Sequence, residues 1–183
     1  MKIFVVEDSK EKFKEIASLL EKIEDVSLEL AGEYVQAREK IKRNSYDILI
    51  LDMTLPRAND TRKFRSHAGK ELMFDMKDAG INIPTIVVTG YLDFGSTNNI
   101  SKEIDKLPVM IKNEKYGCIL EEYLDKIYDI SNFYGIHEFL SDNIPFYLGI
   151  IYFQLQQSIW KKGLLQLIEE SMRERNESFT IRR

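Results

Sequence analysis

Short, unbroken apolar runs alternate along this chain with longer stretches whose apolar residues recur at helical spacing. The clearest runs span residues 3–6, 48–51 and 86–88, the last of them within the predicted strand 84–89. Runs this short and this apolar are typical of strands buried on both faces of a sheet. The helical spacing predicts helices over residues 13–23, 34–44, 69–78, 97–106 and 116–128.

Two weaker stretches complete the pattern. Residues 26–30 alternate between apolar and polar side chains, and residues 109–111 form a brief apolar run. Strand and helix then alternate five times, which predicts an α/β fold with a doubly wound, five-stranded parallel sheet. Right-handed crossovers place the helices on both faces of such a sheet.

Composition narrows the class of protein. The chain has 183 residues, a formal net charge of −4 and one cysteine, Cys118. The charge argues against bulk attraction to nucleic acid or an anionic membrane, and a lone cysteine excludes an internal disulfide. The N-terminus does not read as a signal peptide, and the longest apolar tract, 144–153, is about half of what a membrane span needs. We therefore expect a cytoplasmic protein without a membrane partner.

Polar side chains follow four of the predicted strands. In chain order they are Glu7 with Asp8, then Asp52, Thr89 and Lys112. The carboxyl ends of parallel strands share one edge of the sheet, and three carboxylates crowded there repel unless a cation lies among them. Mg²⁺ prefers such oxygen ligands. We expect Asp52 to be the nucleophile that forms an acyl phosphate, with Thr89 bonding a phosphoryl oxygen and Lys112 balancing its charge.

Five stretches carry a resemblance to a known family. They are Val5-Val6-Glu7-Asp8-Ser9, Ile50-Leu51-Asp52-Met53-Thr54-Leu55-Pro56, Gly69-Lys70-Glu71-Leu72, Ile86-Val87-Val88-Thr89-Gly90, and Lys112. With them the chain resembles the receiver domain of bacterial two-component response regulators, over about residues 1–128. The resemblance implies the flavodoxin-like strand order 2-1-3-4-5.

The same resemblance implies a chemistry for the site. Asp52 would accept a phosphoryl group from a histidine kinase or a phosphotransfer protein. Mg²⁺ would be held by Asp8, Asp52 and the backbone carbonyl of Thr54, with Glu7 acting through a water. The protein would catalyse its own phosphorylation and dephosphorylation, without classical turnover. Thr89 and Lys112 would sense the phosphoryl group and reshape the face made by the fourth helix, fifth strand and fifth helix.

The chain departs from the family pattern in three places. Asn113 follows Lys112 where the family usually has proline, and Lys106, before Leu107-Pro108, is the alternative lysine. Val109 stands where the family's aromatic switch residue is normally found. The segment 57–68 is a long basic insertion, which we interpret as a solvated surface loop or, alternatively, as a lid or a docking site for an acidic partner.

Residues 129–183 would form a helical extension to the receiver. Pro145 marks one helix start, Lys161-Lys162-Gly163 marks its end, and a second helix runs over 164–175, with 176–183 frayed. The extension holds six basic and seven acidic residues, so it lacks the basic face that a DNA-binding unit carries. Its aromatic side chains suit packing on the receiver itself, a homodimer, or a protein effector bound through residues 129–175.

Four functions follow from these patterns. The leading hypothesis is a phosphoacceptor that controls protein–protein contacts. A DNA-binding regulator acting through the short tail and a phosphate sink without output are the alternatives. A phosphatase of the aspartyl-phosphate type is disfavoured, because it needs a second aspartate two residues after the nucleophile, where this chain has Thr54.

Overall fold

The computed structural model describes residues 1–58, 68–89, 110–112, 140–152, 157–175, 177 and 179–181. The predicted helices over 97–106 and 116–128, and most of the basic insertion, lie outside these residues. The elements, in chain order, are β1 (Lys2–Val6), α1 (Lys10–Leu20), β2 (Ser27–Ala31), α2 (Tyr34–Arg43), β3 (Ile48–Leu51), α3 (Ala68–Asp78), β4 (Thr85–Thr89), β5 (Met110–Lys112), β6 (Tyr147–Tyr152) and α6 (Gln157–Glu174).

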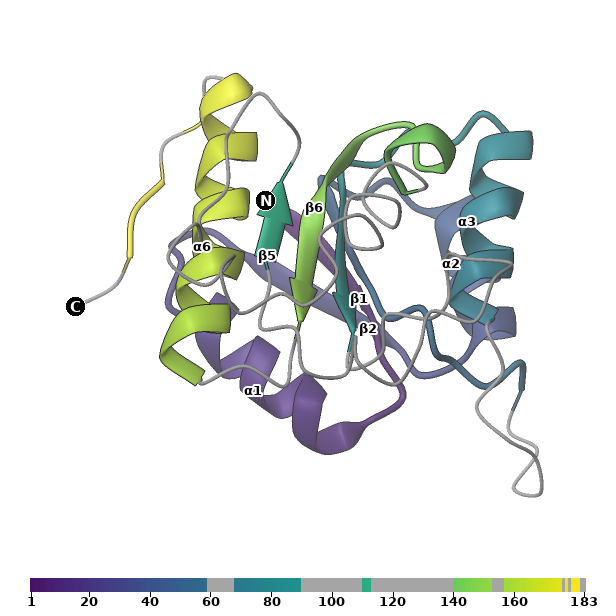
Figure 1. Ribbon diagram of the computed structural model, residues 1–183, viewed down its shortest axis with the longest axis horizontal. Helices are drawn as coiled ribbons and strands as arrows, with labels where there is room; N and C mark the ends of the chain where they lie inside the picture. The colour runs from purple at the N-terminus through teal and green to yellow at the C-terminus, as the bar shows by residue number, and fades with distance from the viewer. Residues whose placement is uncertain are drawn as a thin grey trace, which may run out of the picture.

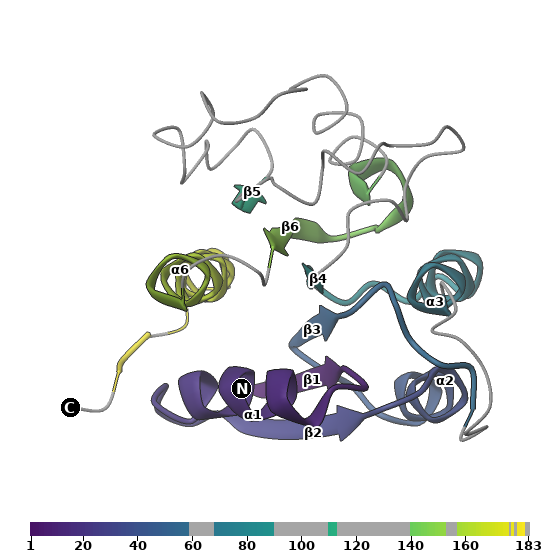
Figure 2. The same ribbon diagram turned by 60° about the horizontal axis from the view of Figure 1, so that its bottom comes forward.

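A central sheet organises these elements (Figure 1). Its order is β2-β1-β3-β4-β6-β5, and the first five strands of that order pair in parallel. The predicted fold class and strand order are confirmed, with β6 as the fifth parallel strand. Helices α1 and α6 lie on one face of the sheet, and α2 and α3 lie on the other (Figure 2).

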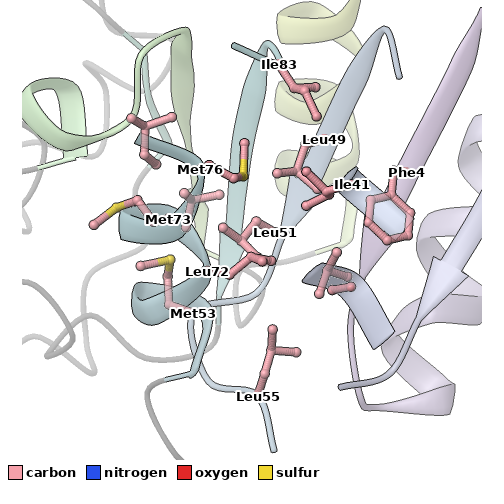
Figure 3. Packing of buried hydrophobic residues seen from close by; sticks show 14 of the residues in the cluster. Phe4, Ile41, Leu49, Leu51, Met53, Leu55, Leu72, Met73, Met76 and Ile83 are labelled. Atoms are coloured by element: carbon pink, nitrogen blue, oxygen red, sulfur yellow. The ribbon is translucent and has the colours of Figure 1, made fainter. Parts of the chain in front are cut away.

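Alternation along the central strands divides the core into two layers. In β1, Phe4 and Val6 pack with α2 and α3, while Ile3 and Val5 pack with α1 and α6. Figure 3 shows the first of these layers, to which β3 contributes Leu51 and α3 contributes Leu72. Because both faces are covered, the central strands are continuous apolar runs, as the sequence pattern indicated.

The prediction of a helix over residues 145–162 is wrong in its first half. Residues 147–152 form β6, in which Tyr147 and Ile150 enter one core layer while Leu148 and Ile151 enter the other. The strand carries one extra residue, Leu148, because Tyr147 pairs with Thr85 and Gly149 pairs with Ile86, so the alternation of faces is shifted at that point. Its apolar side chains enter both core layers, and its aromatic and β-branched composition favours a strand. The segment therefore supplies the fifth parallel strand.

The predicted helix stop at Gly163 is also wrong, because α6 continues through it to Glu174. Glycine inside a helix costs about 1 kcal/mol relative to alanine. Burial of a long apolar stripe outweighs that cost, since Trp160, Leu164, Leu167 and Ile168 are at most 1% exposed. The predicted extension is thus not a separate helical unit, because its strand and helix complete the sheet and one core layer.

Two further predictions need correction at the edges of the fold. The brief strand near 109–111 exists as β5, but it pairs antiparallel with β6 at the outside of the sheet. The segment predicted to be frayed is partly ordered, because Ile181 bridges to Ile23 and the backbone N–H of Glu24 donates to Thr180 O at 2.9 Å. Within the described part of the chain, no helix has the length and apolar character to cross a membrane.

Candidate functional site

The site lies where β1 and β3 end side by side. Val6 and Leu51 are register partners, so the next residues, Glu7 and Asp52, stand next to each other beyond the strands. The backbone N–H of Asp52 donates to Val6 O at 2.9 Å, which continues the ladder by one more bond. Both side chains are largely buried, at 3% exposed for Glu7 and 7% for Asp52.

The three predicted carboxylates meet at this edge. One oxygen each from Glu7, Asp8 and Asp52 lie within 4.8 Å of one another. An all-oxygen, acidic donor set of this kind suits a hard divalent cation such as Mg²⁺ and does not suit metals that prefer nitrogen or sulfur. The residues present therefore fit the metal that the sequence analysis expects.

A lysine that the sequence analysis did not predict joins this cluster. The Lys12 ammonium lies 2.6 Å from Glu7 Oε2 and 2.8 Å from Asp52 Oδ2, and it donates to Val88 O at 2.8 Å. Its side chain is 8% exposed. Lys12 therefore connects the ends of β1, β3 and β4 from the first turns of α1.

Local structure in α1 explains how Lys12 reaches the site. Ser9 caps the helix, and its side chain accepts a hydrogen bond from the Lys12 backbone N–H at 3.3 Å. Lys12 precedes the buried Ile16 by one helical turn, so it lies on the stripe that faces the sheet. A charged residue at a position of the apolar stripe was the signal in the sequence that could have identified it.

Burial dominates the electrostatics of Glu7. It raises the pKa of the Glu7 carboxyl from its ordinary 4.5 to about 7. Lys12 opposes this rise, and the neighbouring charge of Asp52 adds to it. Glu7 Oε1 also accepts a hydrogen bond from the Ser9 backbone N–H at 2.9 Å, which fixes the carboxyl against the start of α1.

The backbone after β3 holds Asp52 in place. Asp52 Oδ1 accepts a hydrogen bond from the Thr54 N–H at 3.0 Å, so its other oxygen, Oδ2, faces Lys12. The start of α3 packs directly on this loop, because a Cβ added to Gly69 would lie 2.2 Å from Asp52 O and 2.5 Å from Met53 Cα. Only glycine allows this approach of two backbones.

Of the other two predicted site residues, Thr89 lies at this edge of the sheet and Lys112 does not. Thr89 is the last residue of β4 and pairs with Tyr152 at the same edge of the sheet. The prediction that Lys112 ends a parallel strand at this edge is wrong, because β5 runs antiparallel and Lys112 pairs with Gly149, three positions before Tyr152. The alternative, Lys106, lies outside the described residues.

The basic insertion is described only at its start and at its end. Arg57 is exposed, and its Nε donates to Glu71 Oε2 on α3 at 3.0 Å. Glu71 thereby neutralises one of the charges that suggested an acidic partner. The other basic residues of the insertion, between 59 and 67, lie outside the described part.

Comparisons with known proteins agree with this geometry. A family model described as "Response regulator receiver domain" matches residues 3–106. The Detocs response regulatory protein DtcB of Enterobacter cloacae (strain JD6301) is 26% identical over 131 residues, covering 68% of each chain.

Solved structures share the fold at low identity. The receiver domain of the Francisella response regulator 1452 is 18% identical, with a TM-score of 0.51 over 93% of this chain and 98% of that one. A CheY-like receiver domain protein from Methanospirillum hungatei JF-1 is 14% identical, with a TM-score of 0.50 over 94% and 97%.

Proposed function

Since this chain belongs to the response regulator receiver domain family, we propose that Asp52 accepts a phosphoryl group from a histidine kinase or a phosphotransfer protein in a Mg²⁺-dependent reaction. The observation that supports this most directly is the meeting of Glu7, Asp8 and Asp52 within 4.8 Å. Asp52 is the central carboxylate, and a backbone N–H and an ammonium fix its two oxygens.

The metal would be held by Asp8, by Asp52 and by the backbone carbonyl of Thr54, with Glu7 contributing through a water. Their hard oxygen donors and the excess of negative charge support this assignment. When bound, Mg²⁺ supplies positive charge to the transferring phosphoryl oxygens. Asp52 itself provides the nucleophile, and the Thr54 N–H orients its carboxylate.

The transfer is an in-line displacement at phosphorus. One carboxylate oxygen of Asp52 forms a bond to phosphorus while the P–N bond of the donor phosphohistidine breaks. The electron pair of that bond stays on the imidazole nitrogen. This nitrogen then takes a proton from water, so that the imidazole leaves as the neutral ring. Hydrolysis of the acyl phosphate later restores the Asp52 carboxylate and releases phosphate.

Output would be transmitted through the neighbouring strands. Thr89 is proposed to hydrogen-bond a phosphoryl oxygen, and its pairing with Tyr152 links the end of β4 to β6. A shift at Thr89 would thereby reach β6 and α6, which belong to the stretch 129–175 proposed to contact a second copy or a protein effector. The face made by the fourth helix, fifth strand and fifth helix, which the sequence analysis also proposed for output, lies mostly outside the described residues.

Phosphoryl uptake from acetyl phosphate tests the proposal. With Mg²⁺, intact-protein mass spectrometry should show the addition of one phosphoryl group, and EDTA should prevent it. Asp52→Asn should abolish uptake, while Asp78→Asn, which changes an exposed aspartate at the end of α3, should leave it intact. A folded wild-type protein that takes up no phosphoryl group, or an Asp52→Asn variant that still takes it up, would overturn the proposal.

A further inference from the structure

We infer that Lys12 is a catalytic residue of this site, the cation that holds Asp52 before transfer and pairs with the phosphoryl group after it. The inference rests on the proposed function, because it concerns the same reaction. The positive charge that the sequence analysis expected from Lys112 at a strand end would thus come from Lys12 on α1.

Contacts of the ammonium support this role. It lies 2.8 Å from Asp52 Oδ2, an oxygen of the reacting carboxylate, and 2.6 Å from Glu7 Oε2. Its third contact, at 2.8 Å, is the carbonyl of Val88, the residue before Thr89. A phosphoryl group on Asp52 would place its oxygens beside the carboxylate, so the ammonium could exchange one contact for another without displacement of α1.

Other cations do not occupy this position in the described part of the chain. Among the residues described there, Lys12 is the one lysine or arginine in an ion pair with Asp52. The antiparallel direction of β5 takes Lys112 away from the edge. Residues 153–156, which follow β6, are Phe-Gln-Leu-Gln, and the next basic residue is Lys161, which lies 3.8 Å from Glu15.

Neutralisation of two buried carboxylates would also place the ammonium between Glu7 and Asp52, so the rate of phosphoryl uptake distinguishes the catalytic role from a structural one. The catalytic role is supported by the contact with Asp52 Oδ2, because this oxygen belongs to the carboxylate that would accept the phosphoryl group. Preorganised charge near a site of transfer stabilises the negative charge that gathers on the transferring oxygens. The Ser9 cap fixes the first turn of α1, so this charge is held in place before the reaction begins.

Lysine variants test the inference. Lys12→Met keeps most of the aliphatic stem and removes the charge, and we expect it to slow uptake from acetyl phosphate by about 100-fold. Lys12→Arg should recover part of that loss. Lys14→Met, an exposed lysine on the same helix, is the matched control and should react at the wild-type rate.

Calorimetric titration with Mg²⁺ alone gives a second readout that needs no phosphodonor. Removal of a positive charge beside the carboxylates should tighten Mg²⁺ binding by about tenfold in Lys12→Met. Slow uptake together with tighter Mg²⁺ binding would show that the rate falls because the ammonium is missing and not because the variant fails to bind the metal. If Lys12→Met does not fold, the double variant Glu7→Gln/Lys12→Met, compared with Glu7→Gln, removes the unpaired buried charge and makes the same comparison.

The outcomes separate this inference from the proposed function. If the wild type takes up phosphoryl and Lys12→Met matches its rate, the inference is overturned and the proposed function stands. If neither the wild type nor Lys12→Arg takes up phosphoryl, the proposed function and this catalytic role fail together. A change in Mg²⁺ affinity would then show only that Lys12 lies at the metal site. A change in unfolding midpoint without a change in rate would assign Lys12 a structural role and overturn the inference.

Discussion

Replacement of Glu7 by glutamine should remove a pH dependence from the stability of the metal-free protein. Burial raises the pKa of Glu7 from 4.5 to about 7, so the folded chain holds this proton more tightly than the unfolded chain does. Stability from this group is therefore fully present below pH 4.5 and is lost as the pH rises to about 7. One pKa unit corresponds to about 1.4 kcal/mol, so the loss is about 3 kcal/mol.

Urea denaturation in EDTA measures this loss. Trp160 is 1% exposed, so its fluorescence should report the unfolding of the core at each pH between 4 and 8. The free energy of unfolding of the wild type should fall by about 3 kcal/mol relative to Glu7→Gln across this range. The difference between the two proteins is the relevant quantity, because carboxyl groups far from Glu7 contribute equally to both curves.

Two controls make this result specific. Glu11→Gln, an exposed acid in the first turn of α1, should keep the wild-type dependence on pH. Saturating Mg²⁺ should flatten the wild-type curve, because a cation nearby favours the ionised carboxyl. Parallel curves for the wild type and Glu7→Gln in EDTA would refute the assignment of the raised pKa to Glu7.

Two further changes test how the fold supports the site. Gly69→Ala should lower the free energy of unfolding by about 3 kcal/mol in urea denaturation, because its Cβ would lie 2.2 Å from Asp52 O; wild-type stability would show that α3 does not approach this loop. A chain ending at residue 128 lacks β6 and α6 and should show no cooperative unfolding by circular dichroism. A cooperative transition there would restore the predicted domain boundary.

The carboxylates could be predicted from sequence because each follows a strand directly. The apolar runs identify β1 and β3, and parallel pairing then brings Glu7 and Asp52 together whatever the rest of the chain does. The order of the first four strands, which puts β1 beside β3, was implied by the resemblance to receiver domains and not by these local signals. The local pattern gave the positions of the strands and the residues that follow them.

The choice of the fifth parallel strand could not be made locally. Residues 109–111 and 147–152 are both apolar runs, and the sequence does not say which of them pairs with β4. In the structure the longer run, residues 147–152, pairs with β4 over five register partners and contributes side chains to both core layers. Pro145 and Gly163 suggested the start and the end of a single helix. The segment between them instead contains a strand followed by the beginning of α6, so the strand was missed.

The position of Lys12 follows from an electrostatic requirement that chain order does not reveal. Glu7 and Asp52 are both largely buried, and two buried carboxylates in contact are strongly destabilising without a counter-charge. Such a charge can come from any element that reaches the carboxyl ends of β1 and β3. Among the described residues this charge comes from the first turn of α1, where Lys12 faces the sheet and contacts both carboxylates. The cation of this site therefore comes from the helix that faces this edge of the sheet and not from the end of a strand.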